Sequence, residues 1–93
     1  MARHSIISLS DTESTRVSSR PTHSGEDITI QNIDSEAVVY LGNSNVSTTN
    51  YGFRLTPGAA WSVELPPKDE IFAVSETDGS KVAVLKVSLE YQK

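Results

Sequence analysis

Short runs of alternating apolar and polar residues fill most of the chain beyond residue 25. In these runs Val, Ile, Leu and aromatic residues recur at every second position, which is the pattern of a strand with one buried face. We predict six strands on this basis, within residues 27–33, 36–42, 51–55, 61–65, 70–75 and 81–91. No stretch shows the three- and four-residue spacing of an amphipathic helix, so we predict no helix.

The last of these stretches, residues 81–91, is the longest. Its odd-numbered positions from 83 to 91 are all apolar or aromatic and form one unbroken apolar face. Lys86, Ser88 and Glu90 point away from that face. In residues 61–65, Trp61 lies on the apolar face of its strand, and we expect it in the core rather than as a platform for a sugar ring.

Turn residues separate the predicted strands. Pro57 and Gly58 are the pair favoured at the centre of a type II turn. Asp78 and Gly79 stand between two strong strands and indicate a hairpin. Six or more short strands with a turn about every ten residues are typical of a small antiparallel sandwich or jelly roll. We therefore predict an all-β fold, a small antiparallel β-sandwich or jelly-roll-like domain with an extended N-terminal arm.

The arm is residues 1–24, and the sandwich domain is residues 25–93. Ten of the 24 arm residues are Ser or Thr, and the bulky apolar residues are few: Ile6, Ile7, Leu9 and Val17. Such a segment buries too little apolar surface to offset the entropy of ordering it, which favours an extended or disordered arm. Residues 5–10 are nevertheless β-rich enough to add a strand to an open sheet edge. Deletion of the arm is expected to leave the sandwich folded; unfolding would show that residues 5–10 are an integral strand.

Charge and composition exclude several classes of function. The 93-residue chain has a net charge of −4, which argues against a DNA-binding protein held by a basic surface. It has no cysteine, which excludes disulfides and Cys-ligated zinc. No apolar run approaches about 18 residues, and the N-terminus lacks the apolar core of a signal peptide. We expect a protein that is made in the cytoplasm and binds neither nucleic acid directly nor a membrane.

Candidate catalytic groups are poorly placed for chemistry. His4 and His23 both lie in the predicted arm, whereas a general base needs a fixed position. The acidic residues occur in pairs at turns or strand edges, where solvated acids are more usual than a glycosidase pair. The sequence has neither the spacing of an EF-hand loop nor a Gly-rich nucleotide loop. We predict no enzymatic activity, no cofactor and no metal site.

Two segments carry the candidate interaction residues. The loop over residues 43–52 is longer than a tight hairpin requires, and polar loops on rigid β-scaffolds are common recognition sites. The arm carries three Arg against two acids, opposite in sign to the remainder, which suits docking on a neighbouring copy. The candidate residues are Arg3, Ile6, Ile7, Leu9, Arg16, Arg20, Asn43, Asn45 and Tyr51.

The order of short motifs resembles one group of known proteins. Tyr-Leu-Gly at residues 40–42 is followed by Asn-Val-Ser at 45–47, Gly-Phe-x-Leu-x-Pro-Gly at 52–58, an alternating strand at 61–65 and Glu-Ile-Phe-Ala-Val-Ser at 70–75. Over roughly residues 28–89 the chain resembles small β-sandwich virion proteins of tailed bacteriophages. Such domains occur in capsid decoration proteins, head fibres and tail modules. One small domain without a repetitive shaft favours the decoration type.

The resemblance implies a function and a set of partners. It implies a structural virion protein that binds the outside of a bacteriophage capsid and reinforces contacts between capsid subunits. The implied partners are the major capsid protein and two further copies of the chain, which would form a homotrimer. The homotrimer is implied by the resemblance alone, because no residue pattern indicates it. The implied location is the capsid surface of the virion. The alternative is a fibre or tail module that binds a host-surface glycan or protein through the loop over residues 43–52.

Overall fold

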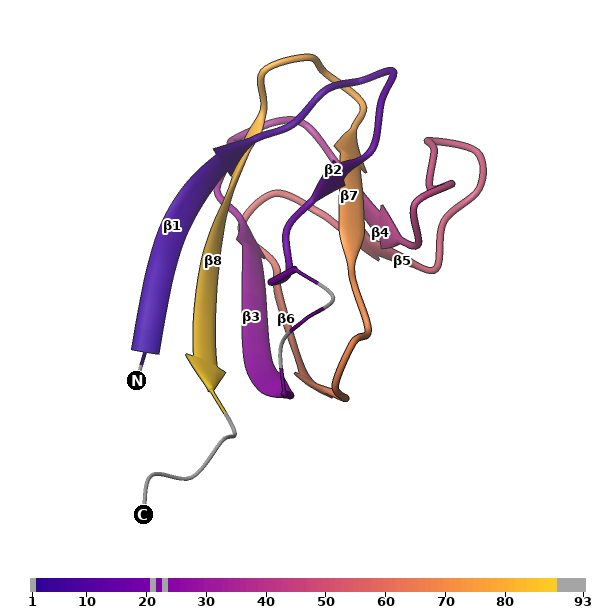
Figure 1. The fold of residues 1–93 in the computed structure, drawn as a ribbon. Coiled ribbons are helices and arrows are strands. Elements are labelled where there is room, and N and C mark those ends of the chain that lie inside the picture. Colours follow the sequence, from indigo (N-terminus) through magenta and orange to yellow (C-terminus); the bar gives the residue numbers. More distant parts are fainter. Residues whose placement is uncertain (1, 21, 23, 89–93) are drawn as a thin grey trace.

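Two four-stranded antiparallel sheets make up the computed structural model of the chain, which describes residues 2–20, 22 and 24–88 (Figure 1). The first sheet has the order β1 (Ala2–Ser8), β8 (Lys81–Ser88), β3 (Glu26–Asn32) and β6 (Ala60–Leu65). The second has the order β2 (Thr15–Arg16), β7 (Phe72–Ser75), β4 (Val39–Gly42) and β5 (Phe53–Leu55). The described residues contain no helix. The predicted all-β fold of sandwich type is confirmed.

The six predicted strand regions each overlap one observed strand, from β3 to β8. Alternation explains how they pack, because every second side chain enters the space between the sheets. Ile28 and Ile30 of β3 are fully buried there, and the second sheet contributes Val39, Leu41 and Leu55. Trp61 is half-buried against this core, as predicted. Its ring stacks on Phe53 at 5.5 Å between centroids, which covers the side of the sandwich where β5 and β6 are the edge strands.

Residues 2–20 supply one strand to each sheet, although the sequence analysis set residues 1–24 apart as an arm. β1 pairs with β8 from Ala2 opposite Val87 to Ser8 opposite Lys81, and β2 pairs with β7. Between and after these strands, Leu9 and Val17 are only 2% and 0% exposed and lie in the core. Composition alone underestimated the order of this segment. The buried side chains of Leu9 and Val17 and the backbone pairing of β1 and β2 are sufficient to hold it against the rest of the two sheets.

The turn at Asp78 and Gly79 forms, but it does not close the predicted hairpin. The amide of Ser80 donates to the carbonyl of Thr77, and Gly79 has a φ of 88°. The strands on either side, β7 and β8, lie in different sheets. A two-residue type I′ hairpin needs positive φ at both central residues, and Asp78 has none. The type II turn predicted at Pro57 and Gly58 is present, with the amide of Ala59 bound to the carbonyl of Thr56.

The apolar face predicted for the last strand points out of the sandwich. Val82 and Val84 of β8 enter the core, whereas Leu85 and Val87 are 45% and 37% exposed. Leu89 and Tyr91 lie outside the described residues. The first half of β8 is apolar on both faces, so alternation alone does not select the inner one. Register selects it, since Val84 stands opposite the buried Ile30 and half-buried Lys86 stands opposite Ile28.

A buried asparagine joins the two sheets at the end of β3. The side-chain nitrogen of Asn32 donates to the carbonyls of Ala37 at 2.8 Å and of Leu55 in β5 at 3.0 Å. Its side-chain oxygen accepts the amide of Asp34. The Asp34 carboxylate in turn accepts the backbone amides of Ala37 and Glu36, which hold the pKa of Asp34 below its ordinary value. This network fixes the turn that carries the chain from one sheet to the other.

Candidate functional site

The predicted interaction residues fall in separate places. Leu9 is buried in the core of its own domain, and Ile7 is partly buried against that core. The other seven lie at the surface in three groups: a pocket with Arg3, Arg16 and Arg20, the outer face of the first sheet with Ile6, and the loop with Asn43, Asn45 and Tyr51.

Four cationic side chains surround one pocket of about 470 Å³, which we call the basic pocket. It lies between one end of the β1–β8 pair and the segment that follows β2, and its lining residues are Arg3, Arg16, Ser18, Ser19, Arg20, Thr22 and Lys86. The structure thus brings together the three predicted arginines. Lys86 was missed because the alternation of residues 81–91 placed it opposite the supposed apolar face.

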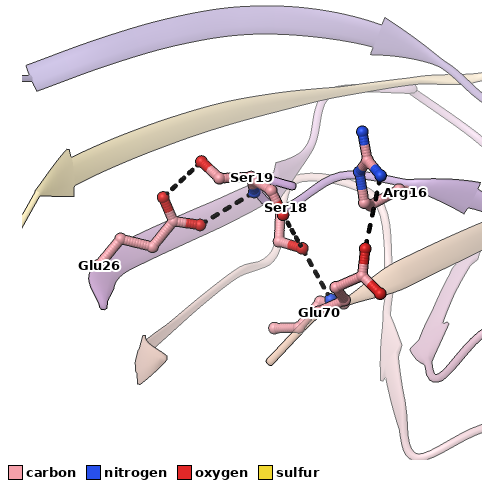
Figure 2. Close-up of polar contacts among 6 residues, drawn as sticks. Arg16, Ser18, Ser19, Glu26 and Glu70 are labelled. Atoms are coloured by element: carbon pink, nitrogen blue, oxygen red, sulfur yellow. Dashed lines mark hydrogen bonds and ion pairs between the residues drawn. The ribbon is translucent and has the colours of Figure 1, made fainter. Parts of the chain in front are cut away.

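The segment of residues 15–20, here called the strap, is bound to both sheets. On one side Val17 donates its amide to the carbonyl of Ile71 at 2.9 Å, and the hydroxyl of Ser18 accepts the amide of Ile71 at 2.9 Å. On the other side the amide and hydroxyl of Ser19 donate to the carboxylate of Glu26 at 3.0 and 2.6 Å (Figure 2). These bonds fix the backbone of the strap between Arg16 and Arg20 against both sheets.

The positive charge at the basic pocket is only partly balanced. Arg16 makes an ion pair with Glu70 at 3.4 Å, and both side chains are partly exposed (Figure 2). Arg3 donates to the hydroxyl of Ser19 at 3.3 Å. The side chains of Arg20 and Lys86 have no hydrogen bond or ion pair within the described part of the chain. The arrangement suits an anion that meets several donors at once.

Apolar side chains are exposed together on the outer face of the first sheet. This apolar strip consists of Ile6 on β1 and, on β8, Ala83, Leu85 and Val87. Ile6 is 63% exposed and stands opposite Ala83. Beside the strip is a shallow hollow of about 330 Å³, whose walls include Ile6, Thr29 and Leu85. The strip borders the edge of the sheet, because β1 pairs with no strand other than β8 within the described residues (Figure 1).

The loop over residues 43–52 has much of its own polar capacity satisfied. The side-chain oxygen of Asn43 accepts the amide of Asn45 at 2.8 Å, and Ser47 and Asn50 form an isolated bridge. Tyr51 is 45% exposed, and its ring lies 4.6 Å from that of Tyr40. Asn43 and Tyr51 line a hollow of about 260 Å³, whereas Asn45 does not. This arrangement leaves Tyr51 as the main side chain that the loop offers to a partner.

The structure describes one of the two histidines. His4 lies exposed on the outer side of β1, and His23 is outside the described residues. Within residues 2–20, 22 and 24–88, no group of three or more His, Asp and Glu side chains could hold a metal ion. The same residues include no helix of the length and hydropathy that crossing a membrane requires. Comparison of the chain with protein-family models, curated proteins and solved structures gave no match.

Proposed function

We propose that this chain is a non-enzymatic structural protein of a tailed-bacteriophage virion, which attaches to the outside of the capsid and reinforces contacts between capsid subunits. The observation that carries the proposal is the apolar strip at the open edge of β1. Clustered exposed apolar side chains on a small soluble domain commonly mark a protein-binding surface. The motif order over residues 28–89 supports a virion protein as the context.

The apolar strip and the β1 edge offer two kinds of contact to the major capsid protein. Burial of the strip removes apolar surface from water, which is worth about 25 cal/mol per Å². The outer edge of β1 presents backbone amides and carbonyls that an extended segment of the capsid protein can pair with. The side chains of Ile6 and Leu85 would lie in the same contact, because both residues are on the outer face of adjacent strands.

Reinforcement follows from rigidity and from copy number. β1 is held along seven residue pairs by β8, so a force on the attached edge is passed into the sheet. In a homotrimer, three weak attachments act together and the effective concentration raises the total affinity. Each trimer would then tie neighbouring capsid subunits to one another.

Substitution of the strip tests this attachment. We expect wild-type protein to sediment with capsids that lack it, and Leu85→Glu to remain in the supernatant, because a carboxylate in a dry interface is costly. Ser35→Glu adds the same charge at an exposed turn outside the strip and should sediment like wild type. The proposal fails if wild-type protein does not sediment, or if Leu85→Glu sediments as well as Ser35→Glu.

The second candidate is a module that binds a host-surface glycan or protein through the loop over residues 43–52. The exposed ring of Tyr51 beside a polar hollow favours it. This role requires Tyr51 in the contact and leaves Leu85 free. Under the capsid proposal, Tyr51→Ala sediments like wild type.

A further inference from the structure

Two cations stand directly opposite each other on the inner side of the first sheet. Arg3 of β1 is in register with Lys86 of β8. Lys86 has the same parity as Val82 and Val84, which are buried in the core, so both cations are on the side that faces the second sheet. Like charges directly opposite one another destabilise a strand pair. The strand pair therefore contains a repulsion between Arg3 and Lys86 that a neutral residue at either position would remove.

The strap adds more positive charge from the opposite wall. Arg16 and Arg20 line the same basic pocket, together with the hydroxyl-bearing residues Ser18, Ser19 and Thr22. The two carboxylates nearest in the hydrogen-bond network are already engaged, Glu70 by Arg16 and Glu26 by Ser19 (Figure 2). A chain of net charge −4 therefore gathers four cations in one place, and among the described residues Arg16 alone of the four has an acid as its ion-pair partner. Local conflicts of this kind are expected at functional sites.

We propose that the basic pocket is a binding site for a phosphate group, either free or on a small phosphomonoester. A phosphate group offers three or more acceptor oxygens and close to two negative charges, whereas a carboxylate offers two oxygens and one charge. The larger set and the higher charge suit a site whose donors come from β1, β8 and the strap together. Arg3 and Arg20 supply the forked donors that match phosphate, and Lys86 supplies a point charge.

The size of the basic pocket leaves room for the group that carries the phosphate. Its volume of about 470 Å³ lies in the range of small-molecule sites, which is about 300–1,000 Å³. The pocket opens on the inner side of the β1–β8 pair, whereas the apolar strip lies on the outer side. The phosphate site is therefore independent of the proposed capsid attachment, and either can fail without the other.

Titration with inorganic phosphate, at an ionic strength held constant with chloride, tests the site. We expect a saturable rise in Tm, with amide shifts in the nuclear magnetic resonance spectrum centred on Ser19, Arg20 and Lys86. Arg20→Gln and Lys86→Gln should each raise the Kd for phosphate by about ten-fold or more, since each removes a charged donor. Lys81→Gln is the matched control, because Lys81 lies on the same strand but is exposed on the outer face.

The effect of Lys86→Gln on Tm, measured with and without phosphate, separates a role in phosphate binding from a role in the stability of the fold. Without phosphate, Lys86→Gln should melt higher than wild type, because it removes the repulsion from Arg3. In saturating phosphate it should gain less in Tm than wild type does. If Lys86→Gln does not fold, Arg20→Gln decides, since its exposed side chain makes no hydrogen bond or ion pair in the described part of the chain.

Three results would overturn the phosphate site. They are an equal rise in Tm with chloride alone, an unchanged phosphate Kd in Arg20→Gln, and equally tight binding of acetate. Parallel titrations with inorganic phosphate and glycerol phosphate identify the source of the group. A lower Kd for inorganic phosphate means a free ion, and a lower Kd for the ester means that the pocket also contacts the group that carries it.

Discussion

At the scale of single residues, the fold depends on polar side chains that face inward. Asn32 and Glu26 both lie on the inner side of β3, among the buried isoleucines, and both are almost completely buried. Each is satisfied by hydrogen bonds to a segment that would otherwise be loose, the turn after β3 for Asn32 and the strap for Glu26. Unsatisfied buried polar groups are costly, so these two residues specify how the connections run.

Asn32→Asp tests this role with almost no change in shape. It replaces a nitrogen that donates to two carbonyls by an oxygen that is repelled by both. We expect the free energy of unfolding to fall by about 3 kcal/mol or more at neutral pH, measured by urea denaturation. Asn45→Asp makes the same change at an exposed loop position and should alter stability by less than about 0.5 kcal/mol. Equal losses in the two variants would contradict the bridging role.

At the scale of elements, the N-terminal segment is the main surprise. β1 and the strap run along the side of the sandwich at which β1 and β2 are the edge strands. Leu9 lies between them in the core, and the carbonyls of Leu9 and Ser10 accept the amides of Gly79 and Ser75. The segment thus joins the ends of β7 and β8, which explains why the turn between those strands crosses from one sheet to the other.

Leu9→Ala separates an integral segment from an attached arm. A buried leucine cut to alanine costs about 2–5 kcal/mol, so we expect a loss of that size in urea denaturation. Ile6→Ala removes a similar side chain three residues away, where it is 63% exposed, and should cost less than about 1 kcal/mol. If Leu9→Ala unfolds at the same urea concentration as wild type, the burial of Leu9 does not stabilise the fold as we infer.

Alternation in the sequence was sufficient to locate β3 to β8 but not to orient or complete the sheets. It failed for β1 because an edge strand exposed on its outer face needs few apolar residues. Ser and His can occupy its exposed positions as well as Val can. It failed for the inner face of β8 because Val82, Val84, Leu85 and Val87 make both faces apolar. Three of the four cations that line the basic pocket were among the predicted interaction residues, because arginines outnumber acids in residues 1–24, but the pocket itself was not predicted. Lys86 was not among the predicted residues, because the sequence analysis assigned the wrong face of its strand to the core.

At the scale of the whole molecule, the two sides of the β1–β8 pair differ in chemistry. The outer side presents the apolar strip, and the inner side presents the cations of the basic pocket. Residues 25–93 are acidic on balance, with ten acids against five bases. An apolar strip bordered by a free strand edge suits a protein partner, and a cationic pocket suits a small anion. The molecule therefore offers two contacts of different kinds from one pair of strands.

Hydrogen exchange of the capsid-bound protein tests the proposed attachment most directly. Amides at the outer edge of β1 have no strand partner among the described residues, so they should exchange rapidly in the free protein. We predict that binding to capsids slows exchange in β1, while the loop over residues 43–52 exchanges as in the free protein. Protection confined to that loop, with β1 unchanged, would contradict the proposed capsid attachment.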